Sequence, residues 1–102
     1  MDVIHLDDLF IDRGTRDATI HHTRVKLTRK EFELLWTLAI KPDHVFHRQE
    51  LLAAVWGVNV TVEPRTVDAH IAHLRKILSE HQTISPRIET VWGIGYRLRS
   101  VS

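Results

Sequence analysis

The sequence predicts an α+β domain in which short strands come first, three helices follow, and a β-hairpin ends the fold. Three observations predict this order. Up to residue 27, apolar and β-branched segments are separated by turn-forming residues. Apolar residues then recur every three or four positions, and two strand-forming segments later flank Gly93-Ile94-Gly95. A chain of 102 residues, 43% of them hydrophobic, is long enough for one domain with one small core.

The first segment, about residues 3–27, is expected to form a small antiparallel sheet. Its strands are expected at residues 3–6, 9–11, 19–20 and 25–27, with a turn at 13–15. The first strands are acidic because they contain or adjoin Asp2, Asp7, Asp8 and Asp12. This sheet is therefore a poor candidate for a surface that faces nucleic acid.

Two helices are expected next, at about residues 28–41 and 48–56. The first begins with a capping box, in which the Thr28 hydroxyl caps the helix and Glu31 reaches back. It should end before Pro42. The second keeps only half of such a box, because a histidine stands at the cap position and Glu50 follows three residues later. Gly57 is a C-terminal stop signal.

A third helix is expected at about residues 64–79, because Pro64 suits a first helical position. Advancing 100° per residue places one apolar stripe at Val67, Ile71, Leu74 and Leu78. The roughly opposite face carries Arg65, Ala69, Ala72 and Lys76, and one shoulder carries Thr66, His70 and His73. Small residues let a helix backbone approach base edges in the DNA major groove, and basic and polar residues bind phosphates and bases. Ala69 could contact a thymine methyl, and His73 is a candidate base-reading residue.

The last segment, about residues 87–99, is expected to be a hairpin. Its strands run from Arg87 to Trp92 and from Tyr96 to Arg99, and the two glycines between them permit the positive φ of a tight turn. The second and third helices form a helix-turn-helix with a long connection at 57–63, and the hairpin forms its wing. The predicted fold is therefore a single winged helix-turn-helix domain over residues 1–102.

Composition excludes several functions. No cysteine is present, so disulfide and thiolate chemistry are excluded. No apolar run approaches the ~20 residues of a membrane span, and no leader is evident, so we expect a cytoplasmic protein without a membrane partner. No catalytic constellation or phosphate-binding glycine loop occurs, so no enzyme is expected. Histidine pairs such as His70 and His73 have a metal-binding spacing, but no carboxylate cluster accompanies them, so neither a metal nor another cofactor is expected.

Charge is unevenly distributed along the chain. Residues 1–63 hold eight lysines and arginines against ten acidic residues, whereas residues 64–102 hold six against three. The total charge of +1 says little by itself, but the excess of positive charge lies in the half that holds the third expected helix. This distribution favours a nucleic-acid partner for that half.

Several short motifs follow one another in a fixed order over nearly the whole chain. They are Leu27-Thr28 with Glu31 to Leu35, Val45 to Leu52, Val55-Trp56-Gly57, Arg65 to Asp68 with His70-Ile71, Leu74-Arg75-Lys76, Thr90-Val91, Gly93, and Gly95 to Leu98. By their joint order and spacing, these motifs resemble one known family, the winged-helix effector domain of OmpR/PhoB-type response regulators.

The resemblance implies a bacterial transcription factor of a two-component system that binds specific double-stranded DNA. The third helix would enter the major groove and the wing would reach the minor groove. Arg65, Thr66 and His70 match phosphate-binding positions, and Arg75 matches a basic DNA-contacting position. Three positions that are arginine in many or some members are Ala72, His73 and Trp92 here. A tryptophan cannot act as a cation in the minor groove, but it could pack against sugar or brace the hairpin.

The resemblance also implies protein partners. The connection at 57–63 would contact RNA polymerase, for which Val58, Val60 and Glu63 are candidates, unless its valines pack inward. Two copies would bind direct repeats as a homodimer. No receiver domain is present in residues 1–102, so a sensor kinase could act only through an absent receiver.

A second class of function stays open from the residues alone. A winged-helix domain can also serve as a protein-interaction module with weak or no specific DNA binding. The departures at Ala72, His73 and Trp92 favour this alternative, whereas Arg65, Thr66, His70 and Arg75 favour DNA binding. Titration with random duplex DNA at two salt concentrations discriminates between them, because phosphate binding weakens steeply with salt.

Overall fold

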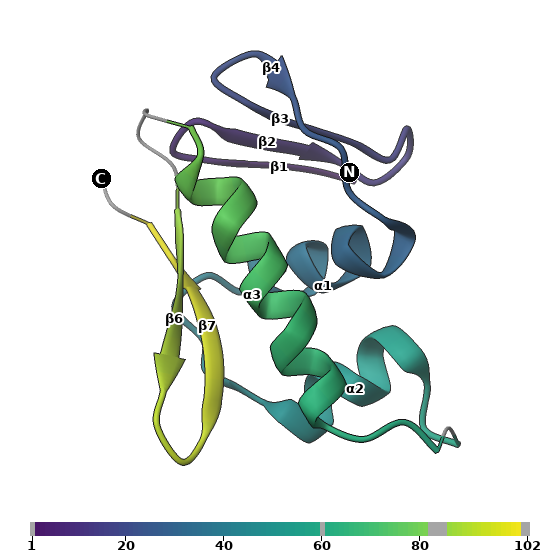
Figure 1. Ribbon diagram of the computed structural model, residues 1–102. Helices are drawn as coiled ribbons and strands as arrows, with labels where there is room; N and C mark the ends of the chain where they lie inside the picture. The colour runs from purple at the N-terminus through teal and green to yellow at the C-terminus, as the bar shows by residue number, and fades with distance from the viewer. Residues whose placement is uncertain (1, 60, 82–85, 101–102) are drawn as a thin grey trace.

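The computed structural model describes residues 2–59, 61–81 and 86–100. A four-stranded sheet is followed by three helices and then by a second, three-stranded sheet (Figure 1). In Figure 1 the first sheet lies at the top, the helices lie below it, and the hairpin of the second sheet lies beside α3. The predicted α+β class and the predicted order of elements are confirmed.

The N-terminal sheet is antiparallel, and its strands are neighbours in chain order. They are β1 (Val3–Leu6), β2 (Leu9–Asp12), β3 (Asp17–Ile20) and β4 (Thr23–Arg24). Its buried side chains, which belong to the hydrophobic core, are Leu9, Ile11, Ala18 and Ile20. The strand expected at 25–27 is wrong. Val25 donates one backbone hydrogen bond to Ala18 (2.9 Å), and the apolar residues there pack on the core while the chain crosses towards the first helix.

The predicted capping signals act at both of the first two helices. In α1 (Arg29–Ile40), the Thr28 hydroxyl accepts from the Glu31 N–H (3.2 Å), and a Glu31 carboxylate oxygen accepts from the Thr28 N–H (2.9 Å). In α2 (Arg48–Trp56), Glu50 accepts from the His47 N–H (2.8 Å). Gly57 follows α2 with a φ of 101°, a conformation that favours glycine.

The third helix, α3 (Arg65–Ser79), has its apolar stripe in the core. Pro64 already has helical backbone angles, with φ −56° and ψ −28°, which agrees with its expected role at the start of the helix. The stripe is buried at Val67, Ile71, Leu74 and Leu78. Packing this stripe against α1, α2 and the second sheet leaves the opposite face of α3 exposed.

The second sheet contains a strand that the sequence did not reveal. Its order is β5 (Phe46–His47), β7 (Gly95–Arg99) and β6 (Arg87–Val91), all antiparallel. A two-residue strand is too short to show an alternating pattern, so β5 had no signal of its own. It attaches the start of α2 to the wing.

The two wing glycines have different roles. Gly93 has a φ of +80° in the turn closed by the Ile94 N–H and the Val91 carbonyl (2.9 Å), as expected. The same expectation is wrong for Gly95, which is not among the residues with positive φ. A Cβ at Gly95 would lie 1.8 Å from the Phe46 carbonyl oxygen, so glycine is required there by the close approach of β5.

Within the part of the chain that the structure describes, no helix is both long enough and apolar enough to cross a membrane.

Candidate nucleic-acid interface

The outward face of α3 is the centre of the candidate interface. Its exposed residues within 65–76 are Arg65, Ala69, Ala72, His73 and Lys76, none of them acidic. Thr66, His70 and Arg75 are only partly buried beside them. The helical spacing therefore placed most of the predicted DNA-contacting residues on one accessible surface.

Arg65 is a highly accessible basic side chain at the start of this face. Its side chain is 80% exposed and forms an ion pair with Glu63 (2.6 Å). Exposed ion pairs of this kind contribute little to stability. A phosphate can therefore take the place of Glu63 at small cost.

Arg75 has a different environment from Arg65. Its Nε donates to the Ile88 carbonyl (2.9 Å), and its Nη2 donates to the Thr90 hydroxyl (2.6 Å). The guanidinium also lies over the Tyr96 ring, 5.7 Å from the ring centre. These contacts attach α3 to the wing, a role that helical periodicity could not reveal.

The shoulder of α3 is held against α2 by an aromatic cluster. The His70 ring meets the Trp56 ring edge-on, with 5.0 Å between centres, and its Nδ1 contacts the Thr66 carbonyl (2.9 Å). The Lys30 ammonium lies over the Trp56 ring and donates a hydrogen bond to the Val55 carbonyl near the end of α2 (3.0 Å). The positive charge of Lys30 also interacts favourably with the negative, C-terminal end of the α2 dipole.

His73 is joined to the first helix. Its Nδ1 contacts the Glu31 carboxylate, and its side chain remains 53% exposed. Burial disfavours the charged Glu31 carboxylate, but the hydrogen bonds from the Thr28 backbone and His73, together with the attraction of His73 when its ring is protonated, outweigh burial and hold the Glu31 pKa below its ordinary value. The candidate base-reading residue is therefore supported from behind by an ionised carboxylate.

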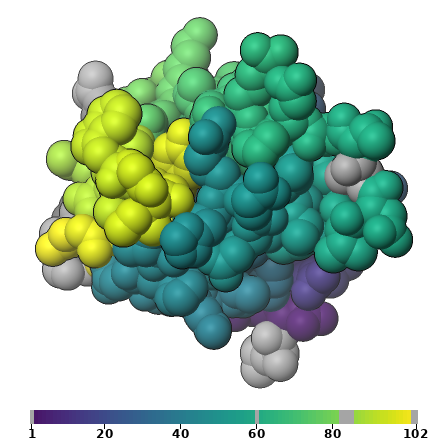
Figure 2. Space-filling model, turned by 90° about the horizontal axis from the view of Figure 1, so that it is seen from below, coloured from purple at the N-terminus to yellow at the C-terminus, as the bar shows by residue number. Residues whose placement is uncertain are grey.

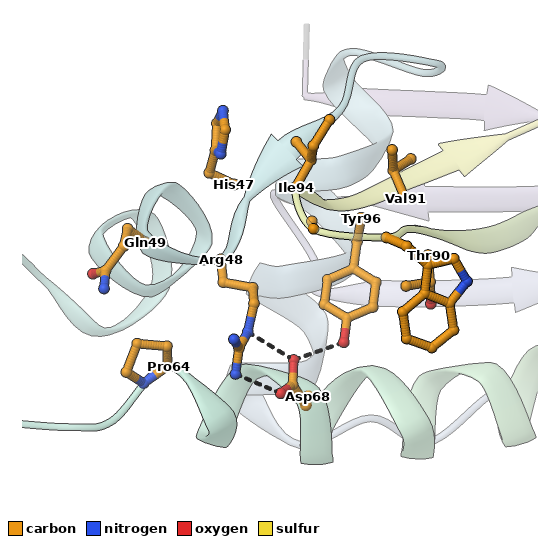
Figure 3. A pocket seen from close by; sticks show the side chains of 12 residues that line it. His47, Arg48, Gln49, Pro64, Asp68, Thr90, Val91, Ile94 and Tyr96 are labelled. Atoms are coloured by element: carbon orange, nitrogen blue, oxygen red, sulfur yellow. Dashed lines mark hydrogen bonds and ion pairs between the residues drawn. The ribbon is translucent and has the colours of Figure 1, made fainter.

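A groove of about 420 Å³ lies between the start of α2, the start of α3 and the tip of the wing. Figure 3 shows Asp68 in this groove between Arg48 and Tyr96. Arg48 forms a two-pronged ion pair with Asp68 (3.1 and 2.7 Å), and the Tyr96 hydroxyl donates to the same carboxylate (2.6 Å). The network joins α2, α3 and the wing, and it neutralises the one acidic side chain of α3.

Sequence reasoning missed Arg48, Asp68 and Tyr96 as parts of this site. A signal was present, because Asp68 is an acidic residue on a helix otherwise suited to bind phosphates. Such a residue needs a neutralising partner in a DNA-binding surface. Burial of Tyr96, followed by its hydrogen bond to Asp68 and the negative charge there, raises its pKa to about 12.

The wing tip forms one side of this face of the molecule. Figure 2, which views the molecule from below, shows the wing in yellow on one side and the segment around the start of α3 in green on the other. Trp92 at the tip is 89% exposed, and Ile94 beside it is also exposed. Trp92 therefore does not brace the hairpin by packing, which removes one of its two expected roles.

The expected polymerase-contact residues are Val58, Val60 and Glu63, and the structure describes two of them. Val58 is 82% exposed, whereas Val62 in the same segment packs on the core. Glu63 is exposed and paired with Arg65. Val60 lies outside the described residues.

No group of three or more histidine or acidic side chains that could hold a metal ion occurs in the part of the chain that is described.

Comparison with known proteins decides the family. Residues 22–98 match the family model described as "Transcriptional regulatory protein, C terminal". The chain belongs to this family of OmpR/PhoB-type effector domains. This confirms the resemblance and the winged helix-turn-helix fold. It also confirms that the domain is not an enzyme, since the family consists of DNA-binding domains of transcription regulators.

Similar proteins include whole response regulators and isolated domains. The response regulator ArlR of Staphylococcus aureus is 37% identical over 98 residues, which are 96% of this chain and 44% of the relative. This effector domain thus spans less than half the length of such curated relatives.

Two solved structures resemble this effector domain closely. The DNA-binding domain of the response regulator AdeR, crystallised in complex with an intercistronic region, has a TM-score of 0.83 and 34% identity, covering 94% of this chain and 98% of that one. The Klebsiella pneumoniae RstA DNA-binding domain in complex with the RstA box has a TM-score of 0.83 and 32% identity, covering 97% and 98%.

Proposed function

We propose that this domain binds specific double-stranded DNA with α3 in the major groove and the wing tip at the minor groove. The observation that carries the proposal is the exposed face of α3. It presents small and basic side chains, and Asp68, the acidic residue of that helix, is neutralised by Arg48 and Tyr96. Such a face can approach a polyanion closely without repelling it.

Each exposed residue has a separate role in this proposal. Arg65 and Lys76, with Thr66 and His70 beside them, contact phosphates, which position the helix. Ala69 faces a thymine methyl, and His73 reads a base edge. The contact of Arg75 with DNA stays a prediction, and its hydrogen bonds to the wing indicate a phosphate beside the wing as the target.

Trp92 extends the proposal to the minor groove. Its exposure at the wing tip leaves the indole ring free to pack against sugars, as apolar side chains of other minor-groove proteins do. Such a contact adds apolar surface rather than charge. It should therefore contribute affinity without increasing the dependence of binding on salt.

Arg65→Ala tests the proposed function directly. The change should weaken binding to all duplexes and lower the slope of log affinity against log salt by about one unit, because one phosphate contact is lost. The measurement is a titration of duplex DNA at several salt concentrations. The matched control is Arg24→Ala on β4, which removes another exposed, ion-paired arginine (Asp17, 2.9 Å) from the N-terminal sheet.

The control should leave the slope unchanged. A slope that is the same in Arg65→Ala and Arg24→Ala would show that α3 does not dock on phosphates. Wild-type protein that shows no salt-dependent binding to any duplex would favour the protein-interaction module instead.

We further propose that two copies bind direct repeats about one helical turn apart, since a ~10 bp spacing places both on one side of the duplex. The AdeR domain in complex with an intercistronic region and the RstA domain in complex with the RstA box support DNA as the partner. Footprinting should show a direct repeat, and an inverted repeat would contradict this arrangement.

Recruitment of RNA polymerase by the segment between α2 and α3 is a separate proposal. Val58 supports it, because a partner that covers this exposed valine removes apolar surface from water and so stabilises the complex. Val58→Ser should abolish transcriptional activation in a reporter assay and leave DNA affinity within about twofold. Glu63→Ala is a second variant for the same assay. It removes the ion pair between Glu63 and Arg65 and should not weaken DNA binding, because Arg65 stays available for a phosphate. Activation that persists in Val58→Ser would remove Val58 from the polymerase contact.

A further inference from the structure

Glu31 and His73 make a contact that neither the capping box nor phosphate binding requires. One Glu31 carboxylate oxygen already accepts from the Thr28 N–H (2.9 Å), which completes the cap of α1. The other oxygen contacts Nδ1 of His73 on α3. The Glu31 side chain is only 6% exposed, so it supports the imidazole from the interior of the domain.

This contact determines which ring nitrogen carries the proton. An ionised carboxylate only accepts hydrogen bonds, so the Nδ1 that faces it must carry hydrogen. In a neutral imidazole the second nitrogen, Nε2, is then an acceptor. No hydrogen bond to Nε2 is formed by the side chains that the structure describes, and the ring is half exposed on the outward face of α3.

An imidazole held in this way presents two different groups to a base edge. As an acceptor, Nε2 matches the amino groups of adenine and cytosine in the major groove. After protonation both nitrogens donate, and Nε2–H matches the O6 and N7 acceptors of guanine. Because Nε2 can accept or donate in this way, uptake of a proton by the ring exchanges one presented group for the other.

We propose that Glu31 is a positioning residue that fixes the tautomer of His73, so that the base preference of this domain changes with pH. The inference rests on the proposed insertion of α3 into the major groove. The charged or titratable neighbours of the ring are Glu31 from α1, with His70 one turn earlier and Lys76 one turn later on α3. Among these groups, only Glu31 is hydrogen-bonded to the ring in the structure.

The test compares base preference at about pH 8 and about pH 6. Selection from random duplexes first finds the preferred site, and competition among duplexes that differ at one base pair then gives the preference at each position. Wild-type protein should favour an adenine or cytosine edge at one position at the higher pH. It should shift towards guanine at the lower pH by about tenfold, the size of one good base contact.

Glu31→Gln distinguishes positioning from simple packing. The Thr28 N–H needs an acceptor, so the amide oxygen should keep the cap and the amide NH₂ should face His73. The NH₂ group donates to Nδ1 and therefore favours the tautomer with hydrogen on Nε2. This variant should favour guanine at both pH values, and imidazole nitrogen NMR should show the exchanged tautomer.

Two further variants complete the experiment. His73→Gln should remove the pH-dependent shift in base preference. Because this variant keeps both residues of the capping box, it tests the inference even if Glu31→Gln folds poorly. His5→Gln, on the exposed surface of β1, controls for other histidines and should keep the wild-type shift. A wild-type preference that is identical at both pH values, or a Glu31→Gln variant that shifts as wild type does, would overturn the inference. Absence of salt-dependent DNA binding would instead overturn the proposed function on which it rests.

Discussion

Gly95→Ala is expected to lower the free energy of unfolding by about 3 kcal/mol, at the upper end of the cost of overpacking. The added Cβ would lie 1.8 Å from the Phe46 carbonyl oxygen, 2.8 Å from the Phe46 carbonyl carbon and 3.0 Å from the His47 Cα. All three atoms belong to the backbone of β5, so no side chain can rotate away. The variant can fold only by separating β5 from β7, which also loosens the wing from the start of α2.

Two other glycines, Gly93 and Gly14, provide matched controls for Gly95→Ala. An alanine Cβ at Gly93 meets no atom within 4 Å, and its cost comes from a φ of +80°, about 1–2 kcal/mol. At Gly14 the Cβ meets only a side-chain oxygen of Asp12 at 3.2 Å, which can move. Urea unfolding followed by circular dichroism measures all three. Gly95→Ala that costs no more than Gly93→Ala would show that β5 yields easily.

Features that depend on neighbours in sequence were predictable from the chain. The buried stripe of α3 follows from helical spacing, and the Thr28–Glu31 capping box is formed by residues three positions apart. The positive φ of Gly93 likewise follows from the turn that contains it. In each case the partners are close along the chain, so their residue types suffice to identify the structure.

Features that depend on distant partners were not predictable in the same way. The requirement for glycine at position 95 comes from β5, which has too few residues to show a strand pattern. Helical periodicity placed His73 on the shoulder of the outer face, and the family resemblance assigned Arg75 to DNA. Neither could show that Arg75 attaches to the wing and that His73 contacts Glu31. Local capping accounts for only one of the two oxygens of Glu31.

Alkaline pH is expected to reveal the network in the groove through Tyr96, the single tyrosine of the chain. Burial, together with the hydrogen bond to Asp68 and its negative charge, raises the pKa of Tyr96 from 10.0 to about 12, although Arg75 and Arg48 oppose the shift. Between these values the folded state keeps a proton that the unfolded state releases. The stability from this group is therefore fully present below about pH 10 and is lost as pH rises through about 12, by about 3 kcal/mol in total.

Absorbance of the phenolate measures this titration directly, and urea unfolding at several alkaline pH values measures its effect on stability. Tyr96→Phe is the matched control, because it keeps the buried ring and removes the ionisable hydroxyl. Lysines also titrate in this range, so the decisive quantity is the difference in the pH dependence of stability between wild type and Tyr96→Phe. Asp68→Asn should move the Tyr96 pKa back towards 10, because the amide retains a hydrogen-bond acceptor but carries no charge. Phenolate absorbance that rises near pH 10 while the wild-type protein is still folded would show that Asp68 does not hold the Tyr96 proton, and the groove would then lack the link that joins the wing to α3.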